Sequence, residues 1–142
     1  MNAFSISTTR FNATPGIRDV REQVFVREQS VPNELEWDGK DQNAVHIIAT
    51  ARDGQVIGTG RLLPDGHIGR MAVLRDWRQQ GVGSALLQAL LQEAVSAGLS
   101  RVFLHAQTSA VDFYARHGFT RRGEEFMDAG IPHYYMERDL GT

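Results

Sequence analysis

Hydrophobic and polar positions divide the chain into segments that follow two periods, one of two residues and one of about 3.6 residues. The clearest helical segment lies between residues 84 and 97, where an apolar face and a polar face run along opposite sides. The polar face consists of Ser84, Gln88, Gln92 and Ser96, and the apolar face of Leu86, Leu87, Leu90, Leu91, Ala94 and Val95. Gly98 is typical of a helix end, because the residue after the last turn often has positive φ.

Alternation with a period of two predicts strands in the rest of the chain, and turn residues separate them. Asp53-Gly54 predicts a hairpin between two of these strands, and Pro64-Asp65-Gly66 predicts the turn before the next one. The predicted strands cover residues 4–9, 44–52, 55–63, 68–73, 101–106, 119–124 and 132–139.

Two further helices are expected. One begins with Thr14 as its N-cap and Pro15 at its first position, and extends to about Gln29 before Val31-Pro32 breaks it. Its inward face carries Ile17, Val20 and Val24.

The other helix begins at Thr108 or Ser109, with Asp112 at the capping-box position of Ser109, and ends at Gly118. The resulting order, β-α-β-β-β-α-β-α-β-β, predicts an α/β fold with one mixed sheet and helices on both faces. At 142 residues the chain is expected to form a single domain, residues 1–142.

The loop before the long helix is the first candidate for chemistry. The first turn of a helix has unpartnered N–H groups and the positive end of the helix dipole, and the absence of Cβ atoms at Gly81 and Gly83 lets an anion approach them. Arg78 could add a charge-assisted hydrogen bond. The loop is therefore either a phosphate or pyrophosphate site or simply a tight turn. A P-loop lysine is absent, and Leu86 stands where a dinucleotide fingerprint needs glycine.

Composition limits the remaining possibilities. The formal net charge of −2 gives no basic surface for nucleic acid or anionic membrane. The absence of cysteine excludes disulfides and a cysteine nucleophile, and the five histidines have no metal-ligand spacing. No leader-like N-terminus and no membrane-length apolar run are present, so a cytoplasmic protein is expected.

The central stretch resembles the main motif of the GNAT superfamily, the acetyl-coenzyme-A-dependent N-acetyltransferases. Arg78, Gly81 and Gly83 match its Arg/Gln-x-x-Gly-x-Gly/Ala pattern, after a strand that ends in Met71-Ala72-Val73. A second family motif, Asn-x-x-Ala-x-x-Phe-Tyr followed by Gly-Phe, matches in the order and at the distance expected. Its positions here are Gln107, Ala110, Phe113, Tyr114, Gly118 and Phe119, with glutamine in place of asparagine.

The segments FVREQSVP, GRMAV, HAQ and AGIPHYYM are similar to the small bacterial ElaA/YjcF-like members. The resemblance implies a three-layer α/β/α fold whose sheet splays between the fourth and fifth strands, with acetyl-CoA in the gap. Its pantetheine would pair with the free strand edge, and a backbone N–H near Val73 would polarise the thioester carbonyl. The residues implied in cofactor binding are Met71, Ala72, Val73, Arg78, Gln79, Gln80, Gly81, Val82, Gly83, Ser84, Gln107 and Phe113.

The resemblance also implies direct attack by an amine, with Tyr114 as the general acid that protonates the CoA thiolate. Without the family match, Tyr114 would be read as a packed aromatic residue. The base is open, because Gly69 stands where many family members have glutamate. The candidates are Glu28, the acidic residues 34–41, His105 and a water chain, and a lone histidine on an apolar strand is often only a core residue.

The acidic segment from Asn33 to Asp41 is either a solvated loop or the border of the acceptor site. In the second case Glu28, Glu34 and Asp38 would bind a primary amine acceptor. The expected function is an acetyl-CoA-dependent N-acetyltransferase without a metal. The alternatives are an acetyl-CoA-binding sensor without turnover and transfer of longer acyl chains. A homodimer is possible, and the acceptor is not specified.

Overall fold

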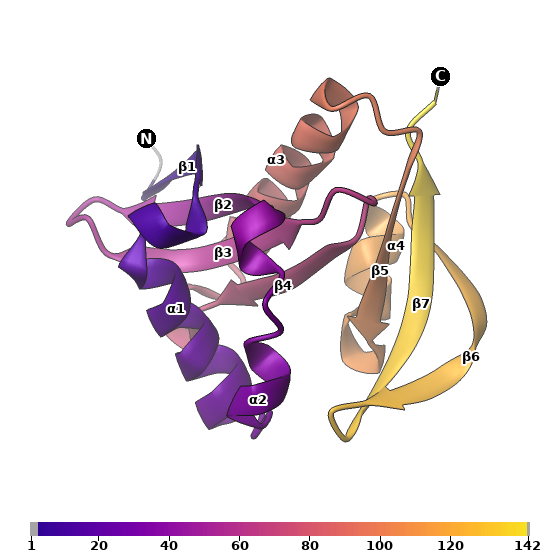
Figure 1. Ribbon diagram of the computed structural model, residues 1–142, viewed down its shortest axis with the longest axis horizontal. Helices are drawn as coiled ribbons and strands as arrows, with labels where there is room; N and C mark the ends of the chain where they lie inside the picture. Colours follow the sequence, from indigo (N-terminus) through magenta and orange to yellow (C-terminus); the bar gives the residue numbers. More distant parts are fainter. Residues whose placement is uncertain (1–2, 142) are drawn as a thin grey trace.

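The computed structural model describes residues 3–141, which form two antiparallel sheets (Figure 1). The first sheet has the strand order β1-β2-β3-β4, and the second has the order β5-β7-β6. The strands are β1 (Phe4–Thr9), β2 (Val45–Ala51), β3 (Val56–Leu62), β4 (Ile68–Val73), β5 (Arg101–Gln107), β6 (Thr120–Asp128) and β7 (Ile131–Asp139). Every predicted strand is present, and β6 continues four residues past its predicted end.

The two sheets meet at a single point between β4 and β5. A parallel bridge joins His67 to Phe103, and the Phe103 N–H donates to the Gly66 carbonyl at 3.0 Å. Beyond this bridge the two strands diverge, as Figure 1 shows. The predicted splaying between the fourth and fifth strands is therefore confirmed, and one edge of β4 is left without a neighbouring strand.

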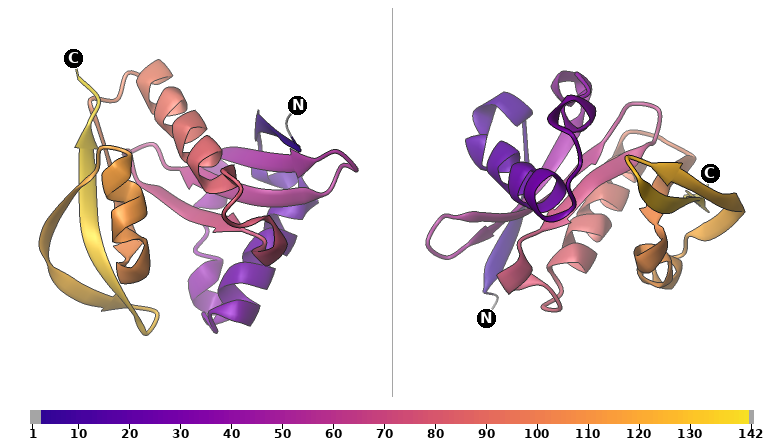
Figure 2. Two further views of the ribbon diagram at one scale, coloured as in Figure 1. Left: turned by 180° about the vertical axis from the view of Figure 1, so that it is seen from behind. Right: turned by 90° about the horizontal axis from the view of Figure 1, so that it is seen from below.

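Helices cover both faces of the first sheet, which gives three layers (Figures 1 and 2). The α1 helix (Pro15–Arg21) and the short α2 helix (Asn33–Glu36) lie on one face, and the long α3 helix (Val82–Ser96) lies on the other. The α4 helix (Val111–Arg116) packs against the second sheet. None of the helices within residues 3–141 has the length and apolarity needed to span a membrane.

The core lies between α3 and the first sheet and follows the predicted apolar face of the helix. Leu86, Leu87 and Leu90 are fully buried against strand residues such as Ile47 and Ile57. Val95 was assigned to this face incorrectly, since 52% of its surface is exposed. Ala94 beside it is fully buried in the core, so Val95 lies outside the edge of the apolar face.

The first predicted helix has the expected extent but two kinds of winding. After α1, residues Glu22–Glu28 form a π-helical segment, η2, which ends with a bond from the Gln29 N–H to the Val24 carbonyl. Thr14 precedes Pro15 as predicted, but its hydroxyl bonds to the Thr9 hydroxyl rather than capping the helix. Short π segments are common at functional sites, and this one leads directly into the cavity described below.

The predicted capping box before α4 is wrong. Residues Thr108–Ala110 form a 3₁₀ turn, and no side chain caps either this turn or α4. The Thr108 hydroxyl instead donates to the Glu125 carboxylate on β6 at 2.8 Å. A bond to a neighbouring strand thus replaces the local bond that the sequence pattern suggested.

The acidic segment is more than a solvated loop, although Glu34 in it is exposed. Its other three carboxylates bind three arginines of α1, β3 and β4 in a largely buried ion-pair cluster. The cluster consists of Arg21, Arg61, Arg70, Glu36, Asp38 and Asp41. Arg21, which is fully buried, binds the Glu36 carboxylate at 2.7 Å and the Asp41 carboxylate at 2.6 Å. Three positive and three negative charges therefore hold residues 33–41 against the first sheet.

Burial and ion pairing have opposite effects on the pKa values of the carboxylates in this cluster. Burial raises the pKa of Glu36, although Arg70 and Arg21 act in the opposite direction. Burial also disfavours ionisation of Asp38, but hydrogen bonds from Arg61 and from the Lys40 N–H overcome it and hold the Asp38 pKa below its usual range. Trp37 lies over the Arg21 guanidinium, 4.8 Å from the ring centroid, and shields it from water.

Removing the central cation is expected to destabilise the fold strongly. Arg21→Met leaves two buried carboxylates short of a partner, so the free energy of unfolding should fall by about 3–5 kcal/mol. Arg27→Met is the matched control on the same helical segment, because the Arg27–Glu22 pair spans 3.6 Å with 66% of the Arg27 side chain exposed. That change should cost less than about 1 kcal/mol. Urea unfolding of both variants measures the difference, and equal losses would contradict this role of Arg21.

Candidate active site

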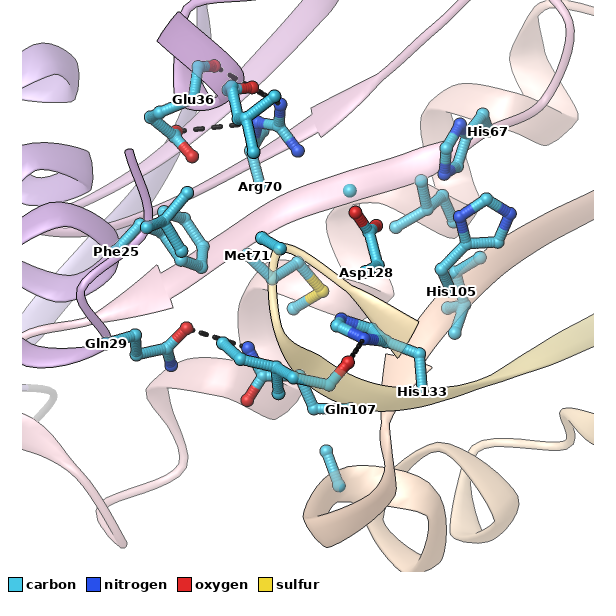
Figure 3. A pocket seen from close by; sticks show the side chains of 18 of the residues that line it. Phe25, Gln29, Glu36, His67, Arg70, Met71, His105, Gln107, Asp128 and His133 are labelled. Carbon is cyan, nitrogen blue, oxygen red and sulfur yellow. Dashed lines mark hydrogen bonds and ion pairs between the residues drawn. The ribbon is translucent and has the colours of Figure 1, made fainter. Parts of the chain in front are cut away.

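A cavity of about 420 Å³ opens where β4 and β5 part (Figure 3). One wall is β4, the opposite wall is the face of the second sheet that carries His105, and the η2 and α2 segments close the side. The turn between β6 and β7 reaches over it from the second sheet. Residues that line it include Phe25, Gln29, Glu36, Asp38, His67, Gly69, Arg70, Met71, His105, Gln107, Ala110, Tyr114, Asp128 and His133.

The edge of β4 that faces this gap offers unpaired backbone groups. The Leu74 N–H donates to the Ile57 carbonyl at 2.9 Å. In an antiparallel ladder, the residues on either side of such a bonded residue point their N–H and carbonyl groups away from the partner strand. Val73, which precedes Leu74 and lies opposite Gly58, is one of these residues. The Val73 N–H is therefore directed toward the gap. The ladder is irregular at Arg70 and Met71, which lie together opposite Gly60, and Arg70 has a φ of 50°.

The glycine loop presents the first turn of α3 at the end of the same strand. Gln79 and Gly81 both have positive φ, 63° and 85°, so Gly81 supplies a conformation that residues with a Cβ rarely adopt. The first backbone bond of α3 runs from the Ala85 N–H to the Gly81 carbonyl. Within residues 3–141, the N–H groups of 82–84 have no backbone acceptor outside the helix, as expected for a helix start.

Arg78 does not point toward those N–H groups. Its Nε donates to the Val73 carbonyl at 2.9 Å, and its Nη2 donates to both carboxylate oxygens of Glu28, at 3.0 and 2.9 Å. Glu28 is thus engaged with a cation outside the cavity lining. The pair ties the end of η2 to the end of β4.

Tyr114 lies between α4 and β4 at the inner end of the cavity. Its hydroxyl donates to the Met71 sulfur at 3.6 Å, and burial raises the pKa of Tyr114 to about 12. Phe113 packs edge-on against it, with ring centroids 5.1 Å apart. Phe113 also covers the glycine loop, since a Cβ added at Gly83 would come within 3.5 Å of its ring.

Gln107 connects the two walls of the gap. Its side-chain amide donates to the Gln29 side chain at 2.8 Å, joining β5 to the end of η2 (Figure 3). Both glutamines line the cavity beside Ala110 and Tyr114. The hydrogen bond therefore fixes the width of the cavity next to the phenol.

Imidazoles line the cavity near the bridge that joins the two sheets. Burial lowers the pKa of His67 to about 4, and the nearby His105 ring, 4.8 Å away between centroids, adds to this shift. Partial burial also lowers the pKa of His105, although Asp128 opposes the change. Both rings are therefore neutral at neutral pH. In the described part of the chain, no group of three His, Cys, Asp or Glu residues is arranged to hold a metal ion.

The structure separates the three acidic residues that were predicted to bind the acceptor. Glu34 is exposed on α2 and does not line the cavity, and Glu28 is held by Arg78. Asp38 does line it, but its carboxylate also binds Arg61 and Arg70. Glu28, Glu34 and Asp38 therefore do not form one acidic surface.

Comparison with known proteins identifies the arrangement. Residues 13–140 match the family model described as an acetyltransferase (GNAT) domain. The chain belongs to the GNAT acetyltransferase family. The free β4 edge and the glycine loop of this GNAT domain are thus the parts that the family resemblance led us to expect, and acetyl-CoA is the acyl donor that the family uses.

Relatives place the chain among small bacterial members of the GNAT family. It is 44% identical over 125 residues to the N-acetyltransferase YjcF of Bacillus subtilis, covering 84% of this chain and 88% of that protein. An acyl-CoA N-acyltransferase from Pseudomonas aeruginosa superposes with a TM-score of 0.83 at 32% identity, covering 95% and 99% of the two chains. ElaA of Escherichia coli superposes with a TM-score of 0.84 at 26% identity, covering 94% and 99%.

Several cavity residues were not found by sequence reasoning. Phe25 and Gln29 enter through the π-helical segment, Arg70 through the irregularity in β4, and His133 through the pairing of β7 with β5. The segment AGIPHYYM did carry a signal, because a histidine follows a turn at the start of a predicted strand. Its partner strand, and therefore the cavity it faces, could not be read from the pattern.

Gly83 allows a direct test of the glycine loop. Gly83→Val should lower the affinity for CoA by about tenfold or more, because the branched side chain would fill the space between Phe113 and the first turn of α3. Ser96→Val, at an exposed position in the last turn of the same helix, introduces the same branched side chain without obstructing the loop. Calorimetric titration with CoA measures both. Equal affinities in two folded variants would mean that the loop is only a turn.

Proposed function

We propose that this GNAT acetyltransferase transfers the acetyl group of acetyl-CoA directly to a primary amine, with Tyr114 as the proton donor to the departing sulfur. The observation that carries the proposal is the position of the Tyr114 phenol, in the cavity between the free edge of β4 and β5. The chain has no cysteine that could carry the acetyl group, which is consistent with direct attack.

The residues that would hold the donor follow from the free backbone groups. The N–H groups of residues 82–84 would bind the pyrophosphate, helped by the dipole of the fifteen-residue α3 helix. The backbone of residues 71–73 would pair with the pantetheine, and the Val73 N–H would stabilise charge on the thioester oxygen. Phe113 and Gln107 would border the donor on the side of α4 and β5. When bound, acetyl-CoA supplies the activated acetyl group.

Arg78 supports this site in a different way from a direct phosphate contact. Its bonds to Glu28 and to the Val73 carbonyl hold the strand end and the loop together. Gln80 also braces the loop, since its side chain donates to the Asp76 carbonyl at 2.9 Å. We therefore assign Arg78 and Gln80 to shaping the site, and the loop N–H groups to contact with the donor.

The acceptor would enter from the side of α2 and the turn between β6 and β7. The ion-pair cluster behind this entrance has balanced charge, so Asp38 would not attract a cationic amine as a free carboxylate would. Asp38 instead forms part of the wall that orients the acceptor. His105, the candidate base from the sequence, lies on the opposite wall.

Tyr114→Phe tests the proton donor. The ring and its packing remain, so acetyl-CoA binding should be nearly unchanged while kcat falls by about 10²–10⁴-fold. Because burial raises the pKa of Tyr114 to about 12, the phenol should keep its proton, and this group should cause no fall in wild-type kcat below about pH 11. Steady-state release of CoA thiol, with an amine from a broad panel, is the measurement.

Tyr134→Phe is the matched control, because Tyr134 is half-buried on β7 against Arg121 and does not line the cavity. It should leave kcat within about twofold of the wild type. A Tyr114→Phe variant that loses donor binding and rate together would indicate a structural hydroxyl. Tight acetyl-CoA binding by the wild type without turnover of any amine would favour a sensor over an enzyme.

A further inference from the structure

We propose that His133 is the group that takes the proton from the acceptor amine. This inference rests on the proposed function and adds the base that the family pattern does not supply, since Gly69 occupies the position where many GNAT proteins carry glutamate. The geometry of the His133 ring, rather than its position in a motif, supports the assignment.

The hydrogen bonding of His133 fixes which nitrogen is basic. Nδ1 lies 2.6 Å from the Ile131 carbonyl oxygen, and a carbonyl only accepts, so Nδ1 carries the hydrogen. In the neutral ring the lone pair is then on Nε2. Within residues 3–141, no hydrogen bond involves Nε2. The ring therefore presents a free basic nitrogen in a fixed orientation.

The pairing of β7 with β5 directs this nitrogen into the cavity. His133 lies directly opposite Gln107, and residues opposite each other in an antiparallel pair project from the same face. Figure 3 shows the His133 ring directed into the cavity, toward the side where Met71 and Gln107 lie. Met71 accepts the hydrogen bond of Tyr114, so the proposed base and the proposed acid line the same end of the cavity.

The other cavity imidazoles are less suitably placed. His67 lies at the closed end, where its backbone forms the bridge between the sheets and its ring stacks on Phe103 with centroids 4.8 Å apart. His105 is exposed, and in the described part of the chain its ring makes no hydrogen bond that would fix a tautomer. Only 8% of His133 is exposed, and its ring stacks on Phe126.

His133 and Tyr114 together then account for every proton transfer in the reaction. His133 Nε2 takes one proton from the ammonium form of the acceptor, and the neutral amine nitrogen forms the new bond to the acetyl carbon as the carbon–sulfur bond breaks. Tyr114 gives its proton to the leaving sulfur and regains one from the acylated nitrogen. His133 finally releases its proton to solvent. The products are an amide, CoA thiol and one proton, with no oxidant or reductant required.

The groups around His133 can assist the last step. His105 on β5 and Asp128 on β6 lie close enough to interact electrostatically with one another, and His133 acts on His105 in the same way. Tyr114 on α4 and Arg70 on β4 complete the titratable and charged groups of the facing walls, with Glu36, Asp38 and His67 farther along the lining. His105 and Asp128 are both exposed, so these two side chains lead from the buried His133 ring to solvent.

Two acceptors of similar size test the inference. Ethylamine is protonated at neutral pH and must lose a proton before attack, whereas 2,2,2-trifluoroethylamine is already uncharged. In His133→Gln, which keeps a neutral polar side chain but has no basic nitrogen, kcat/KM for ethylamine should fall by about 10²-fold or more, and that for trifluoroethylamine by less than about tenfold. An equal loss with both amines would indicate a structural role and overturn the proposal.

Matched variants and a measurement on the wild type complete the design. His67→Gln alters another imidazole of the same cavity, and any loss it causes should be equal for the two amines. A selective loss in His105→Gln that equals or exceeds the loss in His133→Gln would overturn the assignment. The ¹⁵N chemical shifts of His133 in the wild type should report a protonated Nδ1 and an unprotonated Nε2, and the reverse would also overturn it. A wild type that acetylates no amine would contradict the proposed function instead.

Discussion

The separation of β4 from β5 after one parallel bridge is the constraint on which the rest of the site depends. A strand edge inside a protein carries N–H and carbonyl groups that need partners. Here the His67–Phe103 bridge closes one end of the gap, and the Gln29–Gln107 hydrogen bond spans it farther along. Between these two contacts the β4 edge has no neighbouring strand, so it is available to a ligand that forms strand-like hydrogen bonds. A short loop, residues 74–81, leads from the same strand to the first turn of α3, so we propose that both sets of free N–H groups bind one ligand.

The second constraint is the ion-pair cluster that holds residues 33–41 in place. Charged side chains of this kind are poorly suited to burial unless they are fully paired, and here each carboxylate meets at least one arginine. Arg70 links the cluster to the cavity, because it lines the space and also donates to the Leu35 and Glu36 carbonyls. The acidic segment thus forms part of the cavity wall, and the arginines neutralise the charges of Glu36, Asp38 and Asp41.

Sequence periodicity predicted most of the fold, because the apolar faces of α3 and of the strands are decided by local spacing. It could not predict the π winding of η2 or the exposed Val95, which depend on tertiary packing. The glycine loop and the helix start after it were predictable, since glycine spacing and a helix start are local features. The contacts on the other side of the cavity were not predictable, because the pairing of Glu36 with Arg21 and of His133 with Gln107 depends on tertiary contacts and strand register.

We propose that acetyl-CoA uses the free backbone of β4 and of the first turn of α3 together. Amide resonances of ¹⁵N-labelled protein, followed during titration with acetyl-CoA, test this directly. We expect the Val73 amide and the amides of residues 82–84 to shift together and to become protected from hydrogen exchange, while those of β1 do not change. Saturable binding that leaves the Val73 amide and the α3 amides unchanged would contradict it.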